Sequence, residues 1–367
     1  MRRCALSNDT AIQPNFTVIG SLPVDKLQAI NLFIQRLMAS LHETYVSPHP
    51  CIKPSFRSVW LLYVVLYASV WLVGVTANAI ALFSLVRLNR RQNRFVLWFL
   101  CNVCATNLLE CVVVLPLTVL ELLLYFWLFG ETVCRMIPVL QTVPILVNVL
   151  NFLTAAVDRY LTLFRQNWRV DRVSYGPALV IGCIWVVSVA FGVPLQSFFD
   201  YVDLGVVLGP AMNGLGICVV RFGTHIREMN VVLIVALYGI PLLVIVYLMV
   251  KTSNELHFQA TQNSDNNTWH PFDQLGLNRV IGGLCGIFAV GWTPLQCFSL
   301  INYVIPESVG MAVVSDFMTI SLLLLGFGAA AFSAVFLLAK KSMLTHILIE
   351  TSADRPNDDQ SVYYMSP

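Results

Sequence analysis

A few charged, aromatic and proline residues stand inside or at the ends of long apolar runs. Asp158 and Arg159 end one such run, where an arginine close to lipid is costly unless a carboxylate pairs with it. Pro294 lies within another run, removes a backbone hydrogen bond there and bends the helix, with the bulky Trp292 beside the bend. These parts predict a bundle with two conformations that an external ligand can bias. The alternative for Trp292 is plain core packing.

The polar segments contain no combination of residues that suggests catalysis. None of them holds a nucleophile with a neighbouring base or a cluster of metal ligands. We therefore expect a protein that is not an enzyme and that needs neither a cofactor nor a metal.

The composition indicates the environment in which these residues lie. Of the 367 residues, 57% are hydrophobic and 11% are charged, whereas soluble domains are roughly a quarter charged. This excludes an ordinary cytosolic enzyme and a disordered chain. Lysine plus arginine total 22 against 20 acidic residues, which argues against a nucleic-acid binder. The chain is predicted to be an integral membrane protein solvated by lipid.

Seven apolar segments follow the first polar stretch, each about as long as the ~20 residues that span a bilayer. They are Val59–Val86, Phe95–Phe129, Met136–Val157, Tyr175–Phe199, Asn230–Val250, Val280–Ile305 and Met311–Ala339. The expected fold is an all-α membrane protein, a seven-transmembrane helix bundle over residues 59–339. Residues 340–367 form a short tail.

Residues 1–58 are expected to be a retained N-terminal tail. They lack the basic-then-apolar start of a signal peptide, and Leu27 and Ile30 belong to a helical apolar pattern within them. Asn8 and Asn15 begin glycosylation sequons, which are usable only outside the cell.

Basic residues in alternate breaks predict the orientation. They are Arg87, Arg90, Arg91 and Arg94, then Arg165, Arg169 and Arg172, and finally Lys340 and Lys341. By the positive-inside rule these breaks are cytoplasmic. With seven crossings the N-terminal tail is then extracellular and the last residues are cytoplasmic.

The third segment carries the most specific motif. Asp158-Arg159-Tyr160 lies 24 residues after Cys134, about 36 Å along a helix. In a seven-span chain with its N-terminus outside, this resembles the Asp-Arg-Tyr motif of rhodopsin-like (class A) G-protein-coupled receptors. The run Phe288-Ala289-Val290-Gly291-Trp292-Thr293-Pro294 is similar to that family's Phe-x-x-Cys-Trp-x-Pro, with Gly291 at the cysteine. Other matches are Asn78, Trp185 and Pro241.

The resemblance implies a function and a place in the cell. In that family the Asp158–Arg159 pair helps to hold the inactive state, and Arg159 meets a heterotrimeric G protein when the sixth helix swings outward. Phe288, Trp292 and Pro294 would take part in that change. The resemblance also implies a multi-pass protein of the plasma membrane and a disulfide between Cys134 and Cys218. Cys4 and Cys51 are a second external pair that could close a loop in the tail.

Three departures from the family pattern fall in one polar region. Asn107 replaces the second-helix aspartate, Phe332-Ser333-Ala334-Val335-Phe336 replaces Asn-Pro-x-x-Tyr, and Met249 replaces a tyrosine, with Tyr247 nearby. Without the carboxylate, we expect sodium to have little effect. Glu110 has two interpretations. It could replace the missing second-helix aspartate, or it could be an intramembrane glutamate that is hydrogen-bonded or protonated. The second is favoured because the azimuth of Glu110 on the helix differs from that of Asn107.

The outer side of the bundle suggests the ligand. Gln141 stands where amine receptors carry an aspartate, and no lysine in the seventh segment could bind retinal. Together with Glu121, Gln296 and Asp316, it gives a mildly acidic, polar rim that suits a peptide with a basic end.

Three functions remain at this point. The lost polar residues favour either a receptor with altered basal signalling or a non-signalling decoy or scavenger, and the intact Asp158-Arg159-Tyr160 favours signalling. A transporter is disfavoured because Glu110 is the one clearly ionisable residue deep in a span.

Overall fold

The computed structural model describes residues 27, 30–31, 52–92, 95–164, 176–209, 214–220, 225–262, 271–304 and 312–346. Leu27, Ile30 and Asn31 are helical. Several residues of the sequence predictions lie outside the described part: Cys4, Asn8, Asn15, Cys51, Arg94, Arg165, Arg169 and Arg172.

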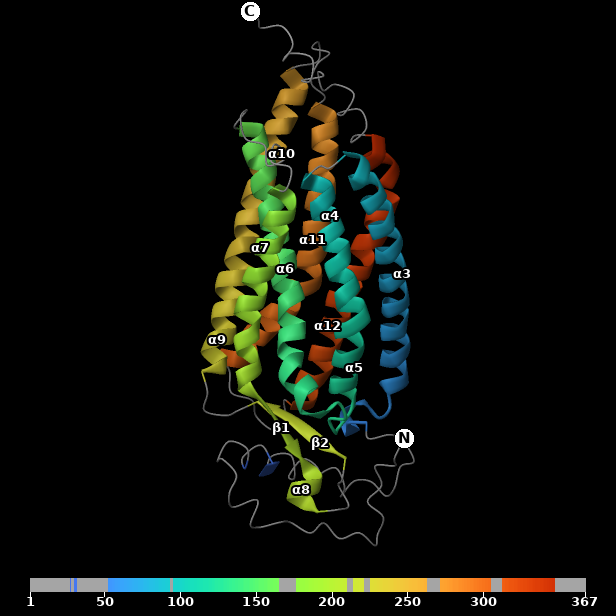
Figure 1. Ribbon diagram of the computed structural model, residues 1–367, viewed down its shortest axis with the longest axis vertical. Helices are drawn as coiled ribbons and strands as arrows, with labels where there is room; N and C mark the ends of the chain where they lie inside the picture. Colours follow the sequence, from blue (N-terminus) through green and yellow to red (C-terminus); the bar gives the residue numbers. More distant parts are fainter. Residues whose placement is uncertain are drawn as a thin grey trace, which may run out of the picture.

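Seven membrane-length helices run side by side in the described part of the chain (Figure 1). Their pieces in order are α3 (Trp60–Gln92); α4 (Phe95–Leu109), η2 (Glu110–Val114) and α5 (Leu115–Leu123); α6 (Gly130–Phe164); α7 (Gly176–Gly192) and η4 (Val193–Phe198); α9 (Ile226–Val232), η6 (Leu233–Gly239) and α10 (Ile240–Gln262); α11 (Pro271–Val304); and α12 (Ala312–Ala339). A short 3-10 turn, η1 (Pro54–Phe56), precedes them. The predicted seven-helix bundle is confirmed. Helices suit lipid because they satisfy the hydrogen bonds of every backbone group within the span.

Two of the helices widen into a π turn just before a proline. In the second helix η2 precedes Pro116, and in the fifth η6 precedes Pro241. Proline has no N–H and its ring collides with the carbonyl four residues earlier, so the local widening relieves that collision while the helix continues. Glu110 is the first residue of η2.

The structure corrects several predicted boundaries. The second helix ends at Leu123 and not at Phe129, because Leu124 bridges Ile52 and Trp127 bridges Gly216 as extended backbone. The third, fifth and sixth helices are longer than their apolar segments and reach Phe164, Gln262 and Pro271. Hydropathy reports the part of a helix that suits lipid, whereas backbone hydrogen bonding carries the helix on into polar sequence.

A β-hairpin, which the hydropathy pattern did not indicate, crosses one end of the bundle (bottom of Figure 1). Strand β1 (Phe199–Asp203) pairs antiparallel with β2 (Gly216–Val220), with Tyr201 opposite Cys218. Between them lies α8 (Leu204–Leu208), whose first turn begins where Asp203 Oδ1 accepts a hydrogen bond from the Gly205 N–H at 2.8 Å. We call this the hairpin end and the opposite one the Arg159 end.

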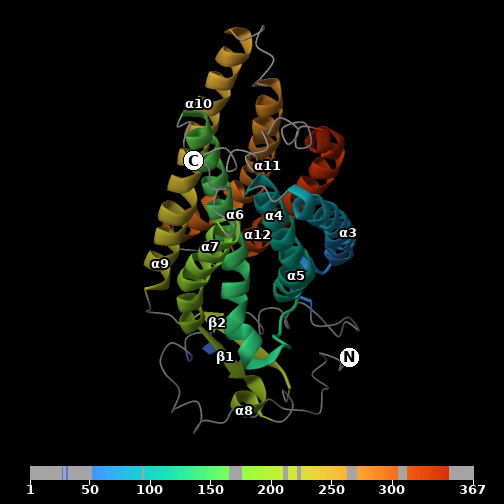
Figure 2. The same cartoon turned by 45° about the horizontal axis from the view of Figure 1, so that its top comes forward.

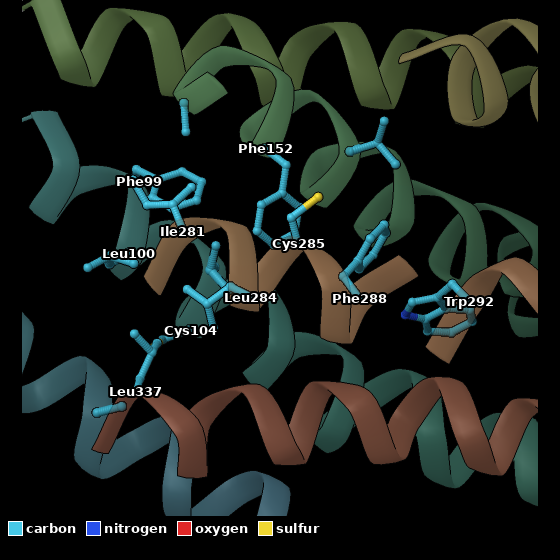
Figure 3. Packing of buried hydrophobic residues seen from close by; sticks show 14 of the residues in the cluster. Phe99, Leu100, Cys104, Phe152, Ile281, Leu284, Cys285, Phe288, Trp292 and Leu337 are labelled. Atoms are coloured by element: carbon cyan, nitrogen blue, oxygen red, sulfur yellow. The ribbon is translucent and has the colours of Figure 1, made fainter. Parts of the chain in front are cut away.

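The core lies between α4, α6, α11 and α12, as Figure 3 shows for one part of it. Phe152 on α6 contacts Phe99 and Phe288, with ring centroids 5.7 and 5.4 Å apart. The outer faces of the helices are apolar as well, since Leu243 on α10 is 72% exposed and Val186 on α7 is 70% exposed. Such faces suit lipid as the solvent.

Candidate functional site

Helix α6 carries a functional group at each end. At the hairpin end Cys134 forms a disulfide with Cys218 of β2, as the resemblance implied. At the other end lie Asp158, Arg159 and Tyr160. A single helix therefore connects the cross-linked hairpin to the arginine at the opposite face.

Backbone contacts and an ion pair hold the hairpin across the bundle. Trp127 exchanges two backbone hydrogen bonds with Gly216 of β2, at 2.8 and 3.2 Å. Gly216 has no room for a side chain, because the ring of Tyr201 occupies the place of a Cβ atom. Arg135 of α6 pairs with Glu131 at 2.6 Å and with the buried Asp200 of β1 at 3.5 Å. The hairpin is thus a fixed cover over part of this end.

The structure joins two of the four ligand-binding candidates. The Gln141 Nε2 donates to Glu121 Oε2 at 3.1 Å and to Thr118 Oγ1 at 3.0 Å, which links α6 to α5. Asp316 on α12 accepts a hydrogen bond from Ser55 Oγ at 3.4 Å. Gln296 is half-buried on α11, one turn from Trp292. Among the described residues, neither Gln296 nor Asp316 makes a hydrogen bond or ion pair with the Gln141–Glu121 pair.

The aromatic residues of α11 lie in the middle of the bundle (Figure 3). Phe288 contacts Phe152 of α6, and Trp292 lies edge-on to Phe327 of α12 at 5.7 Å. Trp292 is 4% exposed, and Pro294 follows it inside the same helix. The tryptophan is therefore a core residue that also stands beside a proline, so packing and a switching role are compatible.

Buried polar residues form a cluster near Trp292, which we call the polar cluster: Asn107, Glu110, Asn148 and Ser333. Asn107 Nδ2 donates to Ser333 Oγ at 2.9 Å and to the Ala330 carbonyl at 3.3 Å. Asn148 Nδ2 donates to Asn107 Oδ1 at 3.4 Å and to Glu110 Oε1 at 3.3 Å. The cluster therefore joins the second, third and seventh helices. A cavity of about 10 Å³, the size of one water molecule, separates it from Trp292.

Glu110 belongs to the same hydrogen-bonded cluster as Asn107. The side chain of Asn148 on α6 reaches both residues, and Glu110 is 1% exposed. Within the described part of the chain, Glu110 Oε2 has no hydrogen-bond partner. Sequence reasoning missed Asn148, although an asparagine 10 residues before Asp158 within an apolar run was a usable signal.

At the Arg159 end, three side chains form what we call the Arg159 cluster. The Arg159 Nη2 donates to Asp158 Oδ2 at 3.2 Å, and Nη1 donates to Gln274 Oε1 at 3.2 Å. Gln274 belongs to α11, so this bond ties the third helix to the sixth. Tyr160 packs against Phe164, with Lys251 of α10 over its ring at 5.6 Å. Sequence reasoning paired Arg159 with Asp158 and missed Gln274.

Comparison with known proteins identifies the family. The chain belongs to the rhodopsin family of seven-transmembrane receptors, whose model, "7 transmembrane receptor (rhodopsin family)", matches residues 77–330. It is therefore a receptor and not an enzyme, and a multi-pass membrane protein.

Three similar proteins give a finer comparison, each at low identity. The chain is 24% identical to neuropeptide Y receptor type 2 of Gallus gallus, covering 74% of this chain and 71% of that protein. It is 21% identical to a QRFP-like peptide receptor of Branchiostoma floridae, covering 69% and 67%. It is 23% identical to G-protein coupled receptor 54 of Oreochromis niloticus, covering 69% and 68%.

Proposed function

We propose that this receptor passes the binding of an extracellular peptide to intracellular G proteins through an outward swing of α11. The observation that carries the proposal is the Arg159 cluster, in which Arg159 of α6 bonds to Gln274 of α11. While that bond holds, α11 stays against α6. When α11 moves outward the guanidinium loses the Gln274 contact and becomes free to meet another acceptor.

A peptide is the ligand class that the residues favour. Two of the similar proteins are named as receptors for peptides, neuropeptide Y and a QRFP-like peptide. The Gln141–Glu121 pair presents an amide and a carboxyl group between α6 and α5. A peptide with a basic end would complement that pair, whereas a small amine would meet Gln141 where amine receptors carry an aspartate.

The alternative is a decoy that binds ligand without signalling. It is favoured by Ser333 in the place of the family's proline and by Asn107 in the place of its aspartate, because both belong to the polar cluster that differs from the family pattern. A decoy would internalise ligand with no change in second messenger.

Ligand-free second-messenger output separates the two functions. We expect Arg159→Ala to abolish the basal output of a signalling receptor, because the guanidinium that meets the G protein is removed. Arg279→Ala is the control, since Arg279 is an exposed arginine on α11. Output is normalised to receptor counted at the cell surface. Equal output from wild type and Arg159→Ala would favour the decoy.

A further inference from the structure

The structure has a cleft at the Arg159 end that no step of signalling uses. It lies between the last turns of α3 and α12, has a volume of about 410 Å³, and is thus in the size range of ligand pockets, about 300–1,000 Å³. Figures 1 and 2 both place these two helix ends side by side. The Arg159 cluster belongs to α6 and α11, so the cleft is a separate feature.

The walls of the cleft are apolar. They are formed by Ala81, Leu85 and Leu88 of α3, Leu337 and Leu338 of α12, and Leu344. Leu344 belongs to the helical turn 341–346, whose start is fixed by a hydrogen bond from the Leu344 N–H to the Lys340 carbonyl at 3.0 Å. This turn closes the cleft on the side away from the membrane centre.

The rim of the cleft is cationic. Lys341 Nζ donates to Ser84 Oγ at 3.2 Å, and the Arg87 guanidinium lies over the Phe83 ring at 4.1 Å. Both cations are exposed, and the described residues that line the cleft include no carboxylate. The rim therefore attracts an anion.

The cleft lies at the boundary between lipid and water. Arg87 is two residues inside the end of the first span at Asn89, and Lys341 is two residues beyond the end of the seventh at Ala339. Phe83, which lines the cleft, is 59% exposed, so the cleft opens on the outer surface of the bundle, where acyl chains lie. A cationic rim above an apolar wall matches an anionic headgroup above its chains.

We propose that this cleft is a binding site for an anionic phospholipid of the cytoplasmic leaflet. The phosphate contacts Arg87 and Lys341, with Ser84 as a further donor, and the upper part of an acyl chain lies along the leucines of α3 and α12. The position in the cytoplasmic leaflet rests on the orientation in the proposed function. The affinity of the cleft for the phospholipid does not rest on that orientation, because it depends on the charge and shape of the cleft itself.

The test measures lipid association of the full chain in nanodiscs. Purified receptor is reconstituted in phosphatidylcholine nanodiscs that contain a small fraction of spin-labelled phosphatidylserine or, in parallel, spin-labelled phosphatidylcholine, and the immobilised fraction is read by electron paramagnetic resonance. We expect wild type to prefer the phosphatidylserine. Arg87→Gln with Lys341→Gln should lower this preference by about 25-fold at most, since each cation contributes about five-fold.

Matched variants make the result specific to the cleft. Arg279→Gln with Lys340→Gln removes the same charge from the described Arg159 end without touching the lining, and should keep the preference. Ser84→Phe keeps both cations and fills the cleft, and should abolish the preference. Melting temperatures confirm that each variant is folded.

The proposal is overturned if the variant with Arg87→Gln and Lys341→Gln keeps the preference for phosphatidylserine. It is also overturned if the control with Arg279→Gln and Lys340→Gln loses as much of that preference, or if Ser84→Phe has no effect on it. Competition by glycerophosphoserine, which has the headgroup without chains, should be weak, and full competition would assign the site to a soluble anion. The measurement needs neither agonist nor G protein, so its failure leaves the proposed function standing.

Discussion

Among the described residues, Arg159 has two hydrogen-bond acceptors, a carboxylate and an amide. Asp158 is a carboxylate on the same helix, so its ion pair with Arg159 does not restrain α11. The bond that does, to Gln274, has a neutral amide as its acceptor, so it lacks the attraction between two opposite charges that adds to the Asp158 contact. The contact that ties α11 to α6 is therefore the weaker of the two, which in the proposed function agrees with a receptor that signals without ligand.

Two substitutions of Gln274 should change the basal second-messenger output in opposite directions. We expect Gln274→Glu to lower ligand-free second-messenger output, because a carboxylate strengthens the bond to Arg159. Gln274→Ala should raise it by at least about tenfold, since a hydrogen bond to a charged group contributes about 1.5–3 kcal/mol. Gln259→Ala is the control, because Gln259 bonds to Glu255 on α10. A lower output from Gln274→Ala would contradict this role.

Asn107 gives a second prediction at this scale. Its amide donates to Ser333 Oγ and to the Ala330 carbonyl, so its donors are already used within the protein. We expect exchange of sodium for potassium to leave the basal output of wild type unchanged, and Asn107→Asp to create a sodium dependence by adding a carboxylate. A marked sodium effect on wild type would instead make Glu110 the acid, and Glu110→Gln should then remove the effect.

At the scale of elements, two glycines determine how closely α11 and α12 pack. A Cβ on Gly291 would collide with the Ala329 Cβ and lie 3.3 Å from the Leu325 carbonyl oxygen. On α12, a Cβ on Gly326 would lie 3.0 Å from Cε3 of Trp292. The cysteine that the family pattern has at Gly291 does not fit this spacing, which gives the departure a structural reason.

The glycine contact can be tested by adding one methyl group. We expect Gly291→Ala to lower the free energy of unfolding by about 1–3 kcal/mol, because overpacking forces the helices apart. Gly286→Ala is a matched control on α11, as a Cβ there has no atom within 4 Å, and it should be neutral or stabilising. Melting temperatures in detergent compare the two. Equal melting temperatures would show that α11 and α12 adjust at no cost.

On the scale of the whole molecule, the two ends have different constructions. The hairpin end is a cover fixed by the disulfide to α6, while the Arg159 end has helices that extend past the lipid and hold cationic residues such as Arg87 and Lys341. The positive-inside rule predicts that the second end faces the cytoplasm, which would leave the hairpin end to meet an extracellular ligand.

Epitope tags test this orientation directly. We expect a tag before Met1 to bind antibody on intact cells and a tag after Pro367 to bind only after permeabilisation. A tag within 263–270, between α10 and α11, should behave like the C-terminal one. Detection of the C-terminal tag on intact cells would show that the orientation is the opposite one and would contradict the proposed function.

The sequence by itself determined the number of spanning helices, the family and the disulfide. Length and hydropathy fix a span because lipid accepts few other structures than helices, and short motifs such as Asp158-Arg159-Tyr160 identify the family once the spans are counted. The tertiary structure decided which residues meet across helices: Gln274 with Arg159, Asn148 with Glu110, and Lys341 with Ser84. These contacts depend on helix rotation, π turns and packing distances, which hydropathy does not encode because most faces of these helices are apolar. The same holds for the hairpin, whose pairing is set by backbone hydrogen bonds between segments with no distinctive composition.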